Sequence, residues 1–219
     1  ATGTDTGGSG LSSVVFTGTT SASKTVTTNG SVSATVTDKA GNTNTCSANV
    51  TKIDTEAPTC TITGLPTDWT TSATLTVSGT DSQSGVSGYS WDGTNYSTTQ
   101  TKSITANGTY TAYVKDNVGR IKNCSASVTK IDATAPTVTF GTNGNSTYAK
   151  SQSTKVTVTD NLSGVATLKY QWTTSTTAPF ASTFTTSFTS GSTITKATDT
   201  GSYYLWILAT DNAGNQIIT

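Results

Sequence analysis

Short stretches in which hydrophobic and polar residues alternate recur along the whole chain. Residues 73–78 place Leu75 and Val77 on one face of an extended segment, and residues 108–114 alternate in the same way. A period of two indicates half-buried β-strands. Turn signals such as 116–119 end these stretches, and no stretch has a helical period. The pattern predicts an all-β protein with about seven short strands in a complete unit.

A linker motif occurs twice and divides the chain into repeats. It reads Lys52-Ile-Asp54-Thr-Glu-Ala-Pro58 and recurs 78 residues later as Lys130-Ile-Asp132-Ala-Thr-Ala-Pro136. A motif repeated at a fixed spacing indicates tandem structural units. We therefore predict a partial unit at 1–53 that lacks the first two strands and a complete unit at 54–131. The third predicted unit, at 132–219, has an extra hairpin and an incomplete last strand.

The third unit is longer than the second in one place. Residues 173–198 form a Ser- and Thr-rich insertion that carries Phe180, Phe184 and Phe188. Their even spacing would place all three rings on one face of a strand, and burial beneath the extra hairpin is the favoured interpretation. The alternative is a ligand surface that includes Phe184 and Trp172. Trp172 itself has the position of a core aromatic, with a sugar-stacking platform as its alternative role.

Charge and composition exclude several classes of function. Twelve basic residues balance twelve acidic ones, and neither sign forms a run. This distribution argues against a nucleic-acid surface and against binding to an anionic membrane. No apolar stretch approaches the length of a membrane span. Because the chain has no histidine, the usual Ser-His relay cannot be built, and we predict a protein that is not an enzyme.

Three motifs together resemble tandem bacterial Ig-like repeats. They are the Lys-Ile-Asp-x-x-Ala-Pro linker, the Asp-x-x-Ser-Gly-Val turn that begins at Asp81 and Asp160, and the Gly-x-Tyr strand followed by Asp-x-Ala-Gly-Asn. The resemblance implies Ig-like β-sandwiches in a surface-anchored or secreted bacterial protein. Such modules act as stalks or spacers in adhesins, or as accessory modules beside catalytic domains.

The resemblance also indicates location and partners. We expect an extracellular, non-catalytic stalk whose partners are neighbouring Ig-like units of the same or of adjacent chains. The alternative is an accessory module that binds a glycan or a host surface protein through its third unit.

The chain has three cysteines. In an Ig-like sandwich the first and last strands run side by side, so we expect Cys60 and Cys124 to form a disulfide. Cys46 occupies the last-strand position of the partial unit, and its partner would lie on a strand upstream. The alternatives are free buried thiols in a reducing compartment, or a Cys46–Cys60 bond, which an extended linker would prevent. A disulfide would indicate an oxidising, extracellular setting.

Aspartates recur at corresponding places in the repeats. In this topology the loop after the second strand and the loop before the last strand lie at the end where the chain enters. Each loop aspartate is therefore expected near the linker aspartate. The predicted groups are Asp54, Asp81 and Asp116 in the second unit, and Asp132, Asp160 and Asp211 in the third. The first unit has an incomplete set, Asp5 and Asp38.

Three carboxylates with nearby loop carbonyls suit Ca²⁺, a hard cation that takes six to eight oxygen ligands. An ion at each group would stiffen the joint between units. The alternative is ordinary turn chemistry, in which each aspartate caps its own backbone.

Overall fold

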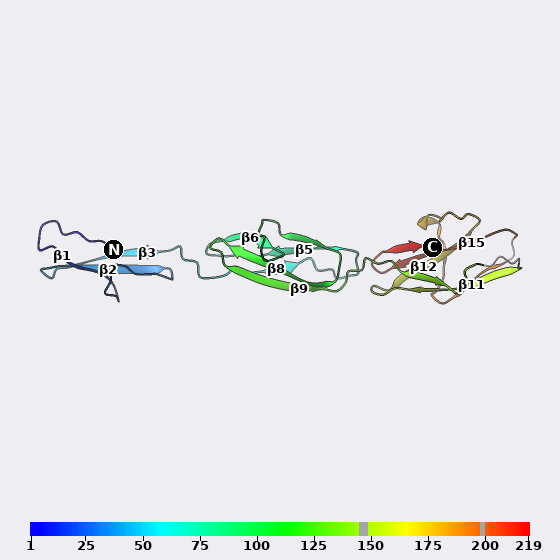
Figure 1. Ribbon diagram of the computed structural model, residues 1–219, viewed down its shortest axis with the longest axis horizontal. Helices are drawn as coiled ribbons and strands as arrows, with labels where there is room; N and C mark the ends of the chain where they lie inside the picture. Colours follow the sequence, from blue (N-terminus) through cyan, green and yellow to red (C-terminus); the bar gives the residue numbers. More distant parts are fainter. Residues whose placement is uncertain (145–148, 198–199) are drawn as a thin grey trace. The chain divides into compact units, whose positions relative to one another are not determined.

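The computed structural model describes residues 1–144, 149–197 and 200–219 (Figure 1). Within these residues the only helical element is the 3₁₀ turn η1 (Ala181–Thr183), so the predicted all-β fold is confirmed. The strands are β1 (Leu11–Phe16), β2 (Gly30–Asp38), β3 (Thr43–Val50), β4 (Thr61–Thr63), β5 (Ala73–Ser78), β6 (Val86–Ser90), β7 (Thr101–Ile104), β8 (Gly108–Asp116), β9 (Ile121–Val128), β10 (Thr137–Phe140), β11 (Ser151–Thr159), β12 (Val165–Thr173), β13 (Thr186–Ser187), β14 (Thr193–Ala197), β15 (Tyr204–Asp211) and β16 (Gln216–Ile218).

The chain folds into two compact units, which are described separately. They are not the three units predicted from the sequence, which are called repeats from here on. The first comprises Ala1–Cys60, Ser78–Thr99 and Tyr113–Asn123, and the second comprises Thr61–Val77, Gln100–Ala112 and Cys124–Thr219. Neither unit is continuous in sequence, and neither has its boundaries at Asp54 or Asp132. The division of the chain into three sequence repeats therefore stays a prediction.

The first unit contains the antiparallel sheet β1-β2-β3. Phe16 lies opposite Ala34, and Ala34 lies opposite Cys46 on the other side. The alternation along β2 directs Val36 to the same face as Ala34, as the sequence predicts. Ala34 is buried, whereas Val36 is only half-buried and β3 is exposed along most of its length.

A second sheet, β6-β8-β9, has the same strand order. β6 and β8 are antiparallel, with Tyr89 opposite Val114. β8 corresponds to β2 in sequence and length, but it is buried more deeply at its C-terminal end, where Val114 and Asp116 are 0% and 1% exposed. Two strands of similar sequence, β2 and β8, are therefore buried to different depths.

The second unit contains the small sheet β4-β5-β7. β5 and β7 are antiparallel, with Leu75 opposite Lys102. Leu75 and Val77 on β5 and Ile104 on β7 are buried. Leu75 and Val77 point to the same face, which confirms the alternation predicted for this strand.

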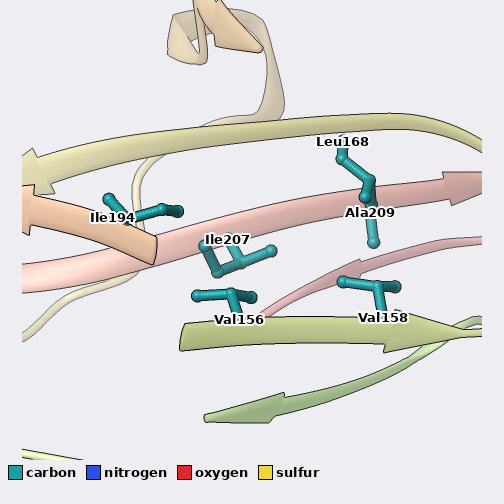
Figure 2. Close-up of a cluster of buried hydrophobic side chains, with 6 residues drawn as sticks. All are labelled: Val156, Val158, Leu168, Ile194, Ile207 and Ala209. Carbon is teal, nitrogen blue, oxygen red and sulfur yellow. The ribbon is translucent and has the colours of Figure 1, made fainter. Parts of the chain in front are cut away.

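The remainder of the second unit is a β-sandwich of two sheets, β10-β11-β14 and β13-β12-β15-β16. Buried side chains from both sheets form its core, and Figure 2 shows them between the strands. They are Val156 and Val158 on β11, Ile194 on β14, Leu168 on β12, and Ile207 and Ala209 on β15. Two antiparallel sheets with these neighbours are the arrangement of Ig-like and fibronectin-type sandwiches.

The run 96–105 contains one strand, β7. β7 is preceded only by an isolated bridge between Tyr89 and Ser97. Before this bridge the chain turns around Asp92, whose Oδ1 accepts hydrogen bonds from the backbone N–H of Thr94 and Asn95, both at 2.8 Å. Such side-chain bonds to the local backbone compete with strand pairing.

Within the described residues of 173–198, the two strands do not pair with each other as the predicted extra hairpin would require. β13 pairs with β12, whereas β14 pairs with β11, so the two strands belong to different sheets. The chain thus crosses from one sheet to the other after β13. Thr198, the last residue of the predicted segment, lies outside the described residues.

Candidate metal centres

The loop after β5 is organised by the carboxylate of Asp81. Its Oδ1 accepts hydrogen bonds from the backbone N–H groups of Gln83, Ser84 and Gly85, at 3.1, 2.7 and 2.8 Å. Gly85 has a φ of 82°, a conformation that glycine adopts without strain. The sequence Asp-x-x-Ser-Gly therefore closes a tight loop around one carboxylate oxygen.

The loop after β11 repeats this arrangement around Asp160. Its Oδ1 accepts hydrogen bonds from the backbone of Leu162 and Gly164, at 3.1 and 2.7 Å. Gly164 has a φ of 79°, as the shared loop shape requires. Repetition of the motif thus means repetition of the loop.

The turns after β8 and β15 hold the second aspartate of each group. Asp116 Oδ1 accepts from the backbone of Val118 and Arg120, at 2.9 and 2.8 Å. Asp211 Oδ1 accepts from Ala213 and Asn215 at the same distances. Each turn is tied to the neighbouring aspartate loop by one backbone hydrogen bond, from Asn117 to Gly85 and from Asn212 to Gly164, both at 3.0 Å.

The linker supplies the third aspartate. Asp54 Oδ1 accepts from the backbone N–H of Glu56, and Asp132 Oδ1 accepts from that of Thr134, both at 3.0 Å. An asparagine fixes the isoleucine that precedes each linker aspartate, because its side-chain amide both donates to and accepts from the isoleucine backbone. The pairs are Asn29 with Ile53 and Asn107 with Ile131.

The structure brings both predicted groups together. In each group one carboxylate oxygen per residue lies within 4.8 Å of the other two; the groups are Asp54, Asp81 and Asp116, and Asp132, Asp160 and Asp211. Asp116, Asp132 and Asp211 are almost fully buried. Three carboxylates so close in a poorly solvated place repel one another unless a cation balances them.

Several oxygens in these groups have no hydrogen-bond partner among the described residues. In the first group they are Oδ2 of Asp54 and Oδ2 of Asp116, on side chains that are 9% and 1% exposed. In the second group they are Oδ2 of Asp160 and the buried hydroxyl Oγ of Ser163. Turn chemistry accounts for the Oδ1 atoms but leaves these oxygens unexplained. These oxygens belong to the aspartates of the groups or to the loop of Asp160, and oxygen atoms are the ligands that a hard cation takes.

Hydrogen bonding holds two of the aspartates in the charged form. The backbone N–H of Gly85, with further bonds from Ser84, lowers the pKa of Asp81 despite the opposing effect of desolvation. Burial tends to raise the pKa of Asp132, but hydrogen bonds from Thr134 and Ser163 outweigh it, so this pKa lies below its ordinary value. Both side chains are therefore anionic at neutral pH.

The first repeat provides only the two loop aspartates. Asp5 accepts hydrogen bonds from the backbone of Gly7 and Gly10. Asp38 accepts from both the backbone and the side chain of Asn42, and the side-chain bond above all lowers the pKa of Asp38. Neither residue belongs to a group of three metal-ligating side chains in the described part of the chain.

Sequence reasoning missed the asparagines that support these groups. Asn29 and Asn107 hold the linker, and Asn215 holds Asp211 through its side chain. The signal was available, because Asn29 and Asn107 are 78 residues apart in the register of the linker motif.

The predicted disulfide is present. Cys60 and Cys124 are disulfide-bonded, and Cys124 lies on β9. Cys46 on β3 is free and exposed. The alternatives of free thiols at Cys60 and Cys124 and of a Cys46–Cys60 bond are therefore excluded.

The aromatic residues of the third repeat differ in exposure. Phe184 is 2% exposed, so its ring is part of the interior and cannot serve as a contact surface in this conformation. Phe188 packs edge-on against Tyr170, with ring centroids 6.1 Å apart. Phe180, in contrast, is 84% exposed. The three rings thus do not share one face, because the segment that carries them does not form one strand.

Trp172 packs against the sandwich core and also lines a groove of about 1530 Å³ in the second unit. Tyr203 and Trp206 line the same groove, as does Lys196, whose Nζ lies 4.4 Å from the centroid of the Tyr203 ring. The indole N–H of Trp172 has no hydrogen-bond partner within the described residues. This groove is the place where aromatic faces gather near polar groups.

No protein-family model matches the chain, and no curated protein matches it. One similar solved structure contains fibronectin(III)-like modules of CbhA from Clostridium thermocellum, with 14% identity and a TM-score of 0.33; the match covers 74% of this chain and 90% of that chain. Another is SGBP-B of the Bacteroides ovatus mixed-linkage glucan utilization locus, in complex with a mixed-linkage heptasaccharide. It has 13% identity and a TM-score of 0.18, over 94% of this chain and 58% of that chain. At these identities and TM-scores the likenesses carry no argument about function.

Within the residues that the structure describes, no helix combines the length and the apolar character needed to cross a membrane.

Proposed function

We propose that this chain is a non-catalytic, extracellular spacer of Ig-like β-modules from a bacterial surface or secreted protein, and that its two aspartate groups bind Ca²⁺. One observation carries the proposal. Two groups of three carboxylates recur at the same register of the repeat, and both contain buried oxygens without a partner among the described residues. Recurrence at a linker favours a structural role, because a single catalytic site would not need to be repeated.

The chemistry of the groups favours calcium over other metals. Their ligands are all oxygens, whereas zinc prefers nitrogen and sulfur. The carboxylates come from a linker and two loops, which can adapt to the long and variable bonds that calcium accepts. Magnesium instead requires near-ideal octahedral geometry and retains several waters. A calcium ion would also reduce the repulsion among three neighbouring carboxylates.

A spacer role follows from what the ion would connect. In the first group Asp54 belongs to the linker, and Asp81 and Asp116 belong to the loops that follow it. An ion bound by all three would hold the linker to the loops and reduce its freedom. The disulfide fits the proposed extracellular setting, since such bonds persist mainly in oxidising compartments.

Small-angle X-ray scattering with calcium and with EDTA tests this role. Calcium is expected to narrow the distribution of interatomic distances, because fewer linker conformations remain. The double variant Asp81→Asn, Asp160→Asn should show no response to calcium. Identical scattering profiles for the wild-type chain in both buffers would contradict the spacer role, and absence of bound calcium would contradict the metal sites.

The groove beside Trp172 favours a second candidate function, the binding of a glycan. Aromatic faces and polar groups occur together there, and sugars stack on aromatic rings while hydrogen-bonding at their edges. Trp172 is retained from the sequence prediction, whereas Phe184 is replaced as a contact by Tyr203. The ligand in this case would be a neutral oligosaccharide.

A glycan array with the full chain tests this candidate. Tyr203→Ala should abolish any signal without unfolding the protein, and Phe180→Ala provides a matched control, since Phe180 is exposed but does not line the groove. A signal that survives the Tyr203 variant, or the absence of any signal, would leave the spacer role as the only function supported.

A further inference from the structure

We infer that the two calcium sites differ in affinity, that the Asp132 site is the stronger, and that the residue four positions after the last aspartate sets much of the difference. That residue is Arg120 in one site and Asn215 in the other. The inference rests on the calcium binding proposed above. It is carried by differences in how the two sites hold their own oxygens.

Asn215 connects two members of the Asp132 site. Its amide Nδ2 donates to Oδ2 of Asp211 at 2.7 Å and to the backbone carbonyl of Asp132 at 3.0 Å. A carboxylate oxygen has a second lone pair, so Asp211 Oδ2 can accept this bond and still bind a cation. The amide is neutral and therefore positions ligands without adding positive charge.

Arg120 acts differently at the corresponding place. Its Nε and Nη2 donate to the backbone carbonyl of Asp54 at 3.3 and 3.1 Å. Oδ2 of Asp116, which corresponds to the oxygen that Asn215 holds, has no hydrogen-bond partner among the residues described. The guanidinium thus places a positive charge next to the site, and one carboxylate oxygen, Oδ2 of Asp116, is not held by it.

The serine of the aspartate loop adds a second difference. The backbone N–H of Ser163 donates to Oδ2 of Asp132 at 2.9 Å, and so links the loop to the linker aspartate. Its hydroxyl is buried without a partner among the described residues and is available as a further ligand. Ser84, at the same place in the other site, donates its backbone N–H to Asp81 of its own loop, and Oδ2 of Asp54 is left without a partner in the described chain.

Both differences favour the Asp132 site. Calcium affinity depends on the charge of the ligands and on the rigidity of the site. The Asp54 site combines three carboxylates with an adjacent guanidinium, whereas the Asp132 site has three carboxylates and a neutral amide. The Asp132 site is also held together before the ion binds, which lowers the cost of ordering its ligands.

Calcium titration calorimetry on single-site proteins tests the inference. Asp81→Asn leaves only the Asp132 site intact, and Asp160→Asn leaves only the Asp54 site. The Asp81→Asn protein should bind calcium at least tenfold more tightly than the Asp160→Asn protein. A unit positive charge about 6 Å from a divalent ion in a water-like dielectric weakens binding by about tenfold. In the Asp160→Asn background, Arg120→Asn should strengthen binding about tenfold, and in the Asp81→Asn background Asn215→Arg should weaken it by a similar factor.

Asn42→Arg provides the matched control, because it makes the same change in the first repeat, which has no third aspartate, and it should alter neither affinity. Arg120→Gln also removes the charge but keeps a longer side chain, and it replaces Arg120→Asn in the test if that variant does not fold. Equal affinities of the two sites, or exchanges at positions 120 and 215 without effect, would overturn the inference and leave the proposed function standing. If neither single-site protein binds calcium, the proposed function fails with it.

Discussion

The first and second repeats contain the same strand and the same turn, yet only the second assembles a group of three carboxylates. β2 and β8 both have nine residues and end in an aspartate. In both repeats a backbone hydrogen bond ties the turn to the aspartate loop, from Lys39 to Gly10 at 2.9 Å and from Asn117 to Gly85 at 3.0 Å. The hydrogen bond between turn and loop therefore does not distinguish the first repeat from the second.

The third carboxylate and the depth of burial make the difference. Asp38 is half-buried, and Asn42 satisfies its Oδ2. Asp116 is 1% exposed, and its Oδ2 lacks a hydrogen-bond partner in the described part of the chain. Without a third carboxylate, the aspartate of Asp-x-x-Gly thus only caps the backbone of its own turn. It becomes part of a candidate metal site when a linker aspartate and burial are added, and this contrast can be tested.

The largest expected effect concerns the cysteines. Reduction of the Cys60–Cys124 bond should lower the free energy of unfolding by about 4 kcal/mol, because the bond closes a loop of 64 residues in the unfolded chain. Cys46→Ser, at the corresponding position of the first repeat, should change it by less than about 0.5 kcal/mol, since Cys46 is free and exposed. Urea unfolding with and without reductant measures both. If Cys46→Ser lowered the free energy of unfolding as much as reduction does, the assignment of Cys46 as the free cysteine would be contradicted.

The next effect is that of calcium. At a calcium concentration a hundredfold above Kd, the ion should stabilise the region that holds a site by about 2.7 kcal/mol. Asp116→Asn should remove the gain contributed by the Asp54 site, whereas Asp38→Asn should not alter the response. The measurement is the difference between unfolding curves in calcium and in EDTA. If Asp38→Asn reduced the response as much as Asp116→Asn, the first repeat would also bind the ion.

A smaller effect is expected from truncation of the valine shared by β2 and β8. Val114→Ala should cost about 2 kcal/mol, because it removes buried methyl groups and leaves a cavity. Val36→Ala should cost less, about 0.5–1 kcal/mol, since Val36 is only half-buried. Thermal unfolding followed by circular dichroism compares the two variants. Similar losses would show that the two strands have similar environments after all.

The smallest expected effect is that of pH. The pKa of Asp132 is lower in the folded chain than its ordinary value of 3.8, so the unfolded chain binds the proton more readily. The stability that Asp132 contributes is therefore present above about pH 4 and is lost as the pH falls through the folded pKa. Melting temperatures measured between pH 6 and pH 2.5 should decline in this range. The decline should be shallower in Asp132→Asn, and an unchanged slope would contradict the assigned hydrogen bonds.

The fold was predictable from sequence because alternation and turn residues act locally. Leu75 and Val77 alternate with polar residues within one strand, and the loop at position 85 has a left-handed conformation that glycine adopts without strain. The approach of Asp54 to Asp81 and Asp116 was also predictable, because the repeat and the sandwich topology determine which loops are neighbours.

The supporting contacts were not predictable, because they depend on the orientation of side chains between distant segments. Nothing in the local sequence indicates that Arg120 reaches the carbonyl of Asp54, or that Ser163 donates to Asp132. The hairpin predicted for residues 173–198 was wrong for a related reason. Its Ser- and Thr-rich composition suits either sheet, and pairing with β12 and β11 decided where β13 and β14 lie.

The central claim is that a linker aspartate converts a pair of turn aspartates into a calcium site. Crystals grown with calcium, and measured at a wavelength at which calcium scatters anomalously, test it most directly. The account predicts anomalous peaks within bonding distance of Asp54, Asp81 and Asp116 and of Asp132, Asp160 and Asp211, and none between Asp5 and Asp38. A peak at Asp5 and Asp38, or no peak at either group of three, would contradict it.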